Sequence, residues 1–520
     1  MKIKNLKEML THIKGYGDRA SFIVKTGQGE EVKETSYNEF VAQVNALGTY
    51  LHSLGLCGKH VAVISENRYE WVVSYLAAIC GGVVVPIDRD LPEESILYLL
   101  KAGEAEAVFY SDVYSDIIEK SGINHQICFD TADYSDAMSK GRELLEKGDT
   151  SFTATTVDND KMASLLFTSG TTGFSKGVML SHKNIVSNIF AATSFEKYEE
   201  HETLLSILPY HHAFECTVGL MASLNFGATI CINDSLKYLR ENMLLFRPSV
   251  MFIVPAIANA VYKRLMDAEE MFERPLTSEE VQALAFGGRL KAVFSGSAPL
   301  NVELINKFKD YGISLLQGYG LTETSPVVST TKFANINETN INSVGEIIPG
   351  CEVKIVDKEI WVKGENVMLG YYKNPESTAE VMDGEWLKTG DLGYLDENGF
   401  LFINGRKKNL IIASGGENVY PEEIEQYLYN IPAIIDALVY GGDDPSRETV
   451  TAVIHPDYEN TENAGKPTEE IEDLIRDEID KINEKLPVYK HITAVKFRNK
   501  PFEKTTAKKI KRNAENQKGE

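Results

Sequence analysis

Near the start of the chain, stretches with apolar residues at every third or fourth position alternate with short continuous apolar runs. Between residues 37 and 56 apolar side chains recur every three or four positions, which is typical of an amphipathic helix. Residues 61–65 then form a short, almost wholly apolar run, which is typical of a buried strand. The same alternation continues at residues 71–79, 83–86, 93–101 and 107–110. This pattern predicts an α/β fold for the large N-terminal part, with mostly parallel sheets covered by helices.

Further apolar runs follow, and each of them ends in small or polar residues. These runs are residues 163–167, 204–208, 250–254, 291–294 and 313–316. In open α/β sheets, ligands bind beyond the carboxyl ends of the strands. The segments that follow these runs are therefore the first candidates for functional residues.

The segment after residue 167 has the composition of a phosphate-binding loop. Thr168-Ser169-Gly170-Thr171-Thr172-Gly173 is followed by Lys176. Glycines let backbone N–H groups turn toward a ligand, hydroxyls add further donors, and a lysine supplies a cation. The segment is not a Walker A loop, because Lys176 stands between Ser175 and Gly177. A solvated loop rich in Ser, Thr and Gly is the alternative interpretation.

Other strand ends carry candidate ligand contacts. Small residues permit close backbone approach to a ligand, and an aromatic ring offers a face for stacking. A hydroxyl suits a phosphate oxygen, and a carboxylate suits Mg²⁺. Taken alone, each such residue is more often solvated on a loop, so the interpretation depends on their order along the chain. The candidates are His212, then Ser297-Ala298-Pro299, then Gly318-Tyr319-Gly320, then Thr322 and Glu323.

The pattern changes near residue 386. Residues 392–395 and 400–403 are joined by a turn that ends in Asn398-Gly399, which predicts a β-hairpin. Asp391 precedes the hairpin, and a short carboxylate can accept hydrogen bonds from two ribose hydroxyls. The basic segment 405–409 follows, and a simple turn between strands is its alternative interpretation. Helices at 420–429 and 469–486 and strands at 437–440, 449–454 and 492–497 predict a small α+β domain.

Length, charge and cysteine usage narrow the possible functions. A chain of 520 residues is expected to form two or more domains. A formal net charge of −23 argues against nonspecific binding to nucleic acid or to an anionic membrane. The six cysteines show no metal-binding spacing, and no signal peptide or membrane-spanning run is evident. We therefore expect a cytoplasmic protein.

In this order the segments resemble the motifs of the adenylate-forming (AMP-binding) enzyme superfamily. The resemblance is strongest to bacterial acyl-CoA synthetases of the medium- and long-chain fatty-acid type, in GYGLTETSPVVS and GRKKNLIIASGGENVYPEEIE. Ser175 replaces a common proline, Ser297 stands where relatives often carry glycine, and Lys508 replaces the glycine of the terminal lysine motif. The resemblance implies an N-terminal adenylate-binding and acyl-substrate domain over 1–404, a hinge over 405–409 and a mobile C-terminal domain over 410–520.

The resemblance also implies a role for each candidate. Lys509 would be the catalytic lysine, with Lys508 as the alternative, and Thr322, Glu323 and His212 would assist it. Glu323 would also bind Mg²⁺. Lys408 would be the hinge pivot, Gly415 and Gly416 would line the coenzyme A tunnel, and His212 and Gly320 would border the acyl pocket. The residues expected to bind ATP or AMP are Thr168, Ser169, Gly170, Thr171, Thr172, Gly173, Lys176, Ser297, Ala298, Pro299, Gly318, Tyr319, Gly320, Thr322, Asp391, Arg406 and Lys509.

The implied activity is that of an ATP-dependent acyl-CoA ligase. It would convert a carboxylic acid to an acyl-adenylate and pyrophosphate, and then transfer the acyl group to coenzyme A. Gly320 stands where acetate-specific relatives carry tryptophan, so we expect open space there and a preference for medium- or long-chain acids. One alternative is a ligase or adenylation enzyme that loads the thiol of an acyl carrier protein. Another is a non-catalytic protein of the same fold, which the presence of Lys509, Glu323 and Asp391 disfavours.

Overall fold

The computed structural model describes two compact units of the chain. The described residues are 3–27, 29, 31–168, 175–193, 201–296, 300–332, 337, 340–413, 417–442, 450–458, 466–504, 510–512 and 517. The first unit comprises residues 1–352 and 362–387, and the second comprises residues 353–361 and 388–520. The chain crosses between the units within β16 (Cys351–Val356), β17 (Glu359–Gly364) and β20 (Trp386–Leu395).

A seven-stranded sheet forms one core of the first unit. Its strand order is β18-β8-β7-β4-β3-β5-β6. Pairing is parallel from β7 through β6, and antiparallel at the edge where β8 joins β7 and β18. The strands are β3 (His60–Ile64), β4 (Val83–Pro86), β5 (Ala107–Tyr110), β6 (His125–Cys128), β7 (Met162–Thr168), β8 (Lys176–Ser181) and β18 (Gly370–Tyr371). The strands predicted from the apolar runs are thus confirmed.

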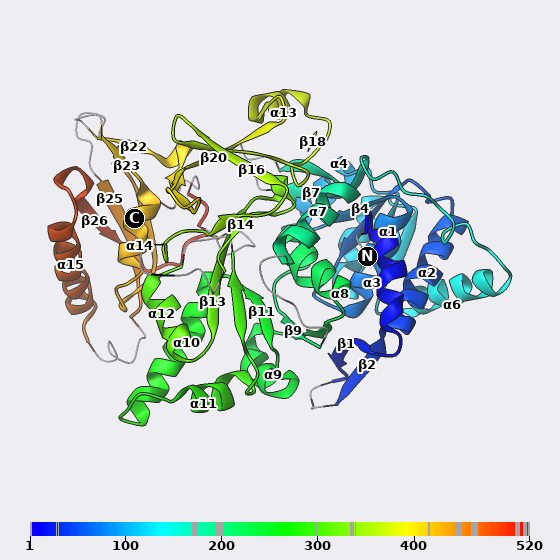
Figure 1. Cartoon of the computed structure of the whole chain (residues 1–520), viewed down its shortest axis with the longest axis horizontal. Helices are drawn as coiled ribbons and strands as arrows, with labels where there is room; N and C mark the ends of the chain where they lie inside the picture. Colours follow the sequence, from blue (N-terminus) through cyan, green and yellow to red (C-terminus); the bar gives the residue numbers. More distant parts are fainter. Residues whose placement is uncertain are drawn as a thin grey trace. The chain divides into compact units, whose positions relative to one another are not determined.

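Helices cover this sheet; those at 37–53, 69–81 and 93–102 were predicted from the sequence, and the one at 132–146 was not. They include α2 (Tyr37–Ser53), α3 (Tyr69–Gly81), α4 (Glu93–Ala102) and α6 (Ala132–Glu146), and α2 packs against both α3 and α6 (Figure 1). A capping box fixes the start of α2, because Ser36 and Glu39 satisfy each other's backbone N–H groups. The crossing of α2 and α6 requires glycine at 141, where a Cβ would lie 2.0 Å from the Ala46 carbonyl oxygen.

A nine-stranded sheet forms the other core of the first unit, in the order β15-β14-β13-β12-β11-β9-β10-β1-β2. Its central strands pair in parallel, and only its two ends are antiparallel. Helix α12 (Val302–Asp310) packs against β13, and α10 (Pro255–Met271) contacts α12 (Figure 1). The strands are β1 (Ala20–Lys25), β2 (Val32–Ser36), β9 (Thr203–Ser206), β10 (Thr229–Ile232), β11 (Val250–Ile253), β12 (Ala292–Ser295), β13 (Ser314–Gly320), β14 (Val327–Thr330) and β15 (Glu346–Ile347).

The second unit contains the predicted small α+β domain. Strands β24 (Ile434–Gly441), β25 (Val450–Pro456) and β26 (Ile492–Phe497) form a three-stranded sheet. Helices α14 (Pro421–Leu428) and α15 (Thr468–Lys485) share an apolar core with these strands, in which Ile424, Ile454 and Ile475 are fully buried. The predicted hairpin is also present, since β20 pairs antiparallel with β21 (Leu401–Arg406).

The remaining α-helices and short strands of the described chain have the following bounds. They are α1 (Leu6–Ile13), α5 (Ser115–Ser121), α7 (His182–Thr193), α8 (Ser223–Asn225), α9 (Leu239–Phe246), α11 (Ser278–Val281), α13 (Pro375–Val381), β19 (Met382–Asp383), β22 (Ile411–Ile412) and β23 (Asn418–Val419). Over the ranges given above, no helix combines the length and the apolar character needed to cross a membrane. The boundaries expected at residues 404 and 410 stay a prediction.

Candidate functional site

The predicted phosphate loop connects the two strands of a β-hairpin. Thr168 ends β7 and lies opposite Lys176, which begins β8. The Thr168 hydroxyl donates to the Lys176 carbonyl oxygen at 3.4 Å. Ser169, Gly170, Thr171, Thr172 and Gly173 lie outside the described residues. The sheet therefore fixes both ends of the loop, and Lys176 stands at its base.

Lys176 and Glu323, which are far apart in the sequence, both contact Tyr371. The Lys176 Nζ atom lies 4.9 Å from the centre of the Tyr371 ring, within the range of a cation–π interaction. The Tyr371 hydroxyl donates to Glu323 Oε1 at 2.9 Å. Burial, and then the charge of Glu323, hold the pKa of Tyr371 above its ordinary value of 10. Tyr371 is thus a neutral donor to Glu323 at physiological pH.

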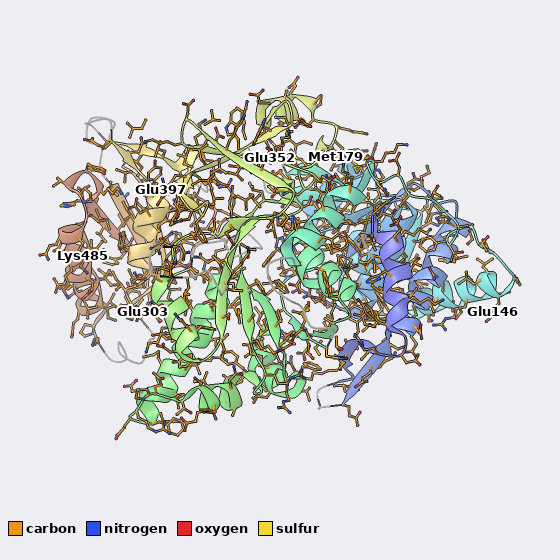
Figure 2. The ribbon with its side chains drawn as sticks, viewed as in Figure 1. Glu146, Met179, Glu303, Glu352, Glu397 and Lys485 are labelled. Carbon is orange, nitrogen blue, oxygen red and sulfur yellow. The ribbon has the colours of Figure 1, made fainter. Side chains whose placement is uncertain are left out.

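Backbone pairing holds these three side chains together. β18, which carries Tyr371, pairs with β8 on the edge where Met179 is labelled in Figure 2. The Tyr372 amide donates to the Gly177 carbonyl oxygen at 2.7 Å. The Met368 amide donates to the Glu323 carbonyl oxygen at 2.9 Å. The arrangement therefore depends on main-chain hydrogen bonds in addition to side-chain contacts.

Thr322 and Glu323 lie in a tight turn between β13 and β14. The two strands pair antiparallel, with Gly318 opposite Thr330 and Tyr319 opposite Ser329. Within the turn the Leu321 amide donates to the Pro326 carbonyl oxygen at 3.0 Å. The sequence motif Gly318–Glu323 thus folds as a strand end followed by a turn, as expected for ligand-binding residues.

Gly320 corrects one of our expectations. A Cβ atom at this position would lie 1.8 Å from the Pro326 carbonyl oxygen. The inference that a missing side chain leaves room for an indole is therefore wrong, because backbone fills that space. Glycine is required here by the close approach of the turn, so this residue carries no information on the length of the acyl chain.

The segment expected to hold adenine begins beside this motif. β12 and β13 pair in parallel, with Ser295 opposite Gln317. The Leu300 amide donates to Gln317 Oε1 at 3.1 Å, so the far end of the segment is also fixed to β13. Ser297, Ala298 and Pro299 themselves lie outside the described residues.

His212 follows β9 as predicted, and it belongs to a half-buried histidine pair. The rings of His211 and His212 are 4.2 Å apart, and His211 Nε2 lies 3.4 Å from Asp88 Oδ1. Burial, and then the neighbouring His212, hold the pKa of His211 well below 6.5. The pair therefore presents an uncharged His211 ring at neutral pH, and the Asp88 contact is not an ion pair there.

In the second unit, Asp391 and Arg406 contact each other. They lie opposite each other in the β20–β21 register, and Arg406 Nε is 2.7 Å from Asp391 Oδ1. The Asp391 side chain is buried, whereas the Arg406 side chain is 41% exposed. Lys408 lies two residues further on, and burial, then Arg406 and Arg512, lower its pKa. Thus the candidate ribose ligand, the candidate nucleotide contact and the candidate pivot are neighbours.

The other candidates of the second unit fall outside the described residues. These are Gly415, Gly416 and Lys509. The segment of the two glycines is bounded by β22 and β23, which pair with each other, and the Ala413 amide donates to the Glu417 carbonyl oxygen at 2.8 Å. The segment of Lys509 is bounded by an antiparallel bridge between Lys504 and Ile510.

Comparison with known proteins identifies the family. Residues 10–372 match the family described as AMP-binding enzyme, and residues 408–518 match the AMP-binding enzyme C-terminal domain.

The chain belongs to the AMP-binding enzyme family.

Individual relatives agree with this assignment. The chain is 30% identical over 565 aligned positions to a long-chain-fatty-acid–CoA ligase of Bacillus subtilis, covering 98% of this chain and 93% of the relative. It is 30% identical over 456 positions to the long-chain-fatty-acid–CoA ligase FadD15 of Mycobacterium bovis, covering 78% and 75%. The crystal structure of the anthranilate CoA ligase AuaEII with anthranoyl-AMP matches with a TM-score of 0.81 at 21% identity, covering 97% and 95%. The resemblance of the sequence to this superfamily and the expected fold are thus confirmed.

Two further residues of this AMP-binding enzyme, Tyr371 and Glu215, carried no distinctive sequence pattern. Tyr371 links Lys176 to Glu323, yet its only local signal was its place between Gly370 and the Asn374-Pro375 start of α13. Glu215 lies in the π-helix Phe214–Ala222, one turn after His212. π-Helical turns are frequent at functional sites. A glutamate within the run HHAFECT was visible, but its burial was not.

Glu215 is a buried carboxyl group with one polar partner in the described part of the chain. The Ser206 hydroxyl donates to Glu215 Oε1, and Oε2 has no hydrogen-bond partner among the described residues. Burial raises the pKa of Glu215 to about 8. A Cβ at Gly219 would lie 2.8 Å from Oε2, so the absence of a side chain at Gly219 makes room for the carboxyl group. This group is therefore neutral at pH 7.

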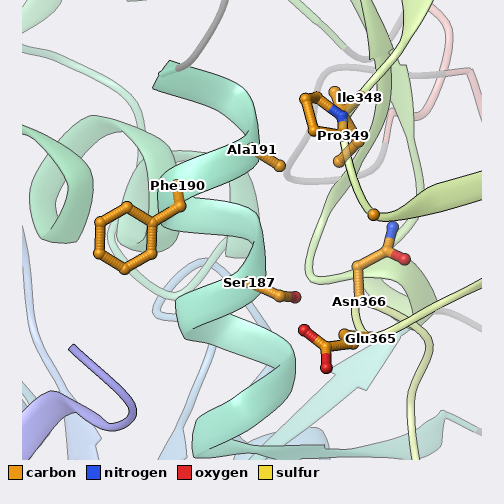
Figure 3. Close-up of a pocket in the computed structure, with 8 residues that line it drawn as sticks. Ser187, Phe190, Ala191, Ile348, Pro349, Glu365 and Asn366 are labelled. Atoms are coloured by element: carbon orange, nitrogen blue, oxygen red, sulfur yellow. The ribbon is translucent and has the colours of Figure 1, made fainter. Parts of the chain in front are cut away.

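A pocket of about 320 Å³ lies behind the turn that carries Glu323. Figure 3 shows its walls, with Ser187 and Phe190 on α7 and Pro349, Glu365 and Asn366 on the facing segments. The Asn366 carbonyl oxygen accepts from the Ser325 hydroxyl at 2.9 Å, and its side-chain amide donates to the Val327 carbonyl oxygen at 3.0 Å. The pocket wall is thus bonded to the same turn, and no sequence pattern indicated this pocket.

Proposed function

We propose that this AMP-binding enzyme activates a medium- or long-chain fatty acid as an acyl-adenylate and transfers the acyl group to coenzyme A. It is an AMP-forming acid–thiol ligase that uses ATP and coenzyme A. The observation that carries the proposal is the convergence of Lys176 and Glu323 on Tyr371 at the base of the phosphate loop, in a chain of this family.

The first half-reaction needs no general base, because the substrate carboxylate is already a nucleophile. One of its oxygens attacks the α-phosphorus of ATP, and pyrophosphate leaves with the electrons of the broken P–O bond. The main difficulty is electrostatic, since an anion approaches a triphosphate. Lys176 at the loop base and Lys509 of the terminal motif would offset that repulsion by preorganised positive charge.

Magnesium fits the residues present at this site. The described residues include no group of three or more His, Cys, Asp or Glu that could hold a metal by themselves. Mg²⁺ in phosphate-transfer sites is commonly held by one or two carboxylates together with substrate phosphates. Glu323 supplies one such carboxylate, and Tyr371 orients it by a hydrogen bond. An ion held there would neutralise charge on the phosphates.

The remaining nucleotide contacts follow the family pattern. Gly318, Tyr319 and Gly320, with Ser297, Ala298 and Pro299, would hold the adenine, and Thr322 would bind the α-phosphate. Asp391 would accept from the ribose hydroxyls, with Arg406 beside it. The ion pair between Asp391 and Arg406 supports this role, because it holds the buried carboxylate in place.

The second half-reaction would use a different arrangement of the small domain. We infer that residues 410–520 rotate about the hinge 405–409, with Lys408 as the pivot, and withdraw Lys509 from the nucleotide. Gly415 and Gly416 would then line a narrow passage for the thiol of coenzyme A, because glycine allows close backbone contact. Relatives named as CoA ligases do not favour the alternative of a carrier-protein thiol.

The substrate class is supported by relatives and not by Gly320. Two relatives at 30% identity are named long-chain-fatty-acid–CoA ligases, which favours a long alkyl acid. His212 would lie near the substrate carboxylate. A cytoplasmic location is part of the proposal, consistent with the free cysteines.

A panel of acids tests the substrate class. Pyrophosphate release from ATP should be measured with acetate, octanoate, palmitate and benzoate, with and without coenzyme A. We expect release to rise with alkyl chain length, and thioester to form only when coenzyme A is present. An enzyme most active with acetate or benzoate, or one that forms no thioester with coenzyme A, would contradict the proposal.

Alanine substitutions of Lys509 and Lys508, made separately, test the mechanism. Lys509→Ala should lower acyl-adenylate formation by two to three orders of magnitude, because one preorganised charge contributes roughly 3–4 kcal/mol. Thioester formation from supplied acyl-adenylate should change little. Lys508→Ala is the matched control, and a larger loss there would move the catalytic role to Lys508.

A further inference from the structure

A charged cluster in the second unit holds an arginine that the proposed mechanism leaves unused. Arg512 Nη1 donates to the Val439 carbonyl oxygen at 3.0 Å, and Nη2 donates to Glu425 Oε2. The Val439 amide in turn donates to Glu425 Oε1 at 2.7 Å. The guanidinium and the carboxylate are therefore both fixed to the same residue of β24.

Burial makes the two groups depend on each other. The side chains of Arg512 and Glu425 are 22% and 10% exposed. Burial raises the pKa of Glu425 to about 7, and Arg512 opposes that shift. Removal of one partner from such a buried pair leaves the other charge uncompensated. Removal of either side chain is thus expected to disturb the position of the other.

The same cluster contacts the hinge segment. Glu422, one turn before Glu425 on α14, lies 3.6 Å from Arg512 Nη2 and also accepts from the Asn409 side chain. Its other carboxylate oxygen lies over Gly405, where a Cβ would be 2.6 Å away. Arg512 therefore lies beside a glutamate that accepts a hydrogen bond from Asn409 and packs against Gly405.

The residues just before Arg512 close the base of the segment that carries Lys509. Lys504 and Ile510 form an antiparallel bridge, and the Lys511 amide donates to the Glu503 carbonyl oxygen at 2.9 Å. Lys504 Nζ lies 2.8 Å from Asp436 Oδ1 of β24, and Phe502 is buried against the same sheet. Lys509 directly precedes Ile510 in the sequence, so this bridge marks the described end of its segment.

We propose that Arg512 is a positioning residue for Lys509. Its ion pair with Glu425, beside Glu422 and the hinge, fixes the base of the lysine-bearing segment to α14. The catalytic lysine and α14 therefore move as one body when the small domain rotates. This inference rests on the proposed function, in which Lys509 acts in adenylate formation and is withdrawn before thioester formation.

A double-mutant cycle tests the inference. Arg512→Gln should lower the kcat of acyl-adenylate formation roughly 10–100-fold, with the KM for ATP changed less than threefold. Thioester formation from supplied acyl-adenylate should stay within threefold of the parent enzyme. Because Arg512 acts only through Lys509, adding Arg512→Gln to Lys509→Ala should cause no further loss.

Control variants separate positioning from folding. Arg476→Gln removes an arginine of α15 that lies over the Phe497 ring, away from the cluster, and should leave both half-reactions unchanged. Glu425→Gln keeps the shape of the acceptor but not its charge, and should cause a smaller loss confined to adenylate formation. Arg512→Lys should restore only part of the rate, because lysine cannot donate to Val439 and Glu425 with a planar fork.

The outcomes distinguish this inference from the proposed function. If Lys509→Ala slows adenylate formation but Arg512→Gln does not, the positioning role is wrong and the proposed function stands. Equal losses in both half-reactions, or losses that add to those of Lys509→Ala, also overturn the positioning role. If Lys509→Ala has no effect, the proposed function fails at its catalytic lysine. Should Arg512→Gln not fold, Glu425→Gln and Arg512→Lys decide the question by the same assays.

Discussion

The two lysines assigned to phosphate chemistry are supported in different ways. Lys176 is the first residue of β8, and that strand is paired on both sides by β7 and β18. The segment of Lys509 is instead held at its base by one short bridge, by Phe502 in an apolar cluster and by the charged groups around Arg512. One lysine thus depends on sheet hydrogen bonds, and the other on side-chain contacts.

This difference fits the different tasks proposed for the two residues. A cation that stays with the phosphates throughout the reaction can be built into the edge of a sheet. A cation that leaves between the half-reactions needs anchors that travel with it. All the anchors named for the terminal segment, namely Asp436, Glu425, Val439 and the Phe502 cluster, belong to the second unit.

The largest effect should come from replacing Glu323, the carboxylate that lies near Lys176 in the first unit. Glu323→Gln should slow acyl-adenylate formation roughly 100–1000-fold and raise the Mg²⁺ concentration needed for half-maximal rate, because a neutral amide binds the ion weakly. Pyrophosphate release measured over a magnesium titration checks this. Thioester formation from supplied acyl-adenylate is the internal control, and an unchanged magnesium dependence would contradict the assignment.

The buried carboxyl groups of the two units also have different partners, and this difference predicts how stability depends on pH. Glu425 faces Arg512, whereas Glu215 has only the Ser206 hydroxyl as a polar partner among the described residues. With a folded pKa near 8 and an ordinary value of 4.5, Glu215 stays protonated in the folded state while the unfolded chain ionises. Its contribution to stability therefore falls as pH rises between these values.

Glu215→Gln should remove that pH dependence. The free energy of unfolding of the variant, relative to the parent, should increase by about 3 kcal/mol between pH 5 and pH 7, since each pKa unit corresponds to about 1.4 kcal/mol. Urea unfolding at several pH values measures the difference. A constant difference across this range would show that Glu215 is ionised in the folded protein.

A smaller effect should follow from altering the backbone turn next to Glu323. Gly320→Ala should destabilise the enzyme by about 2 kcal/mol or more, because the new methyl group overlaps the Pro326 carbonyl oxygen. Gly318→Ala is the matched control, since a Cβ there would be 3.5 Å from the Ser329 carbonyl oxygen, an ordinary contact. Thermal unfolding compares the two, and equal shifts would mean that the close approach at Gly320 is not decisive.

The smallest effect is expected for the side chain between Lys176 and Glu323. Tyr371→Phe keeps the ring below Lys176 but removes the hydrogen bond to Glu323. Acyl-adenylate formation should fall about 5–10-fold, which corresponds to roughly 1 kcal/mol for one lost hydrogen bond. Steady-state kinetics of pyrophosphate release measure it. A loss as large as that of Glu323→Gln would mean that the tyrosine, and not the sheet, places this region.

Much of the fold was predicted from local sequence patterns. The periods of apolar residues predicted β3, α3 and β4 close to their observed bounds, because burial of one face imposes its spacing on each element separately. The turn ending in Asn398-Gly399 predicted the hairpin of β20 and β21 for the same local reason. The order of the motifs predicted the family, and the family match confirmed it.

The tertiary structure alone decided which distant residues meet. Tyr371 lies 48 residues from Glu323, and Arg512 lies 87 residues from Glu425, so no spacing could have paired them. The space at Gly320 was misjudged because the return of the chain at Pro326, and not the residue type, fills it. The period of apolar residues indicates whether a side chain is buried. The residue that this side chain contacts is instead determined by the path of the whole chain.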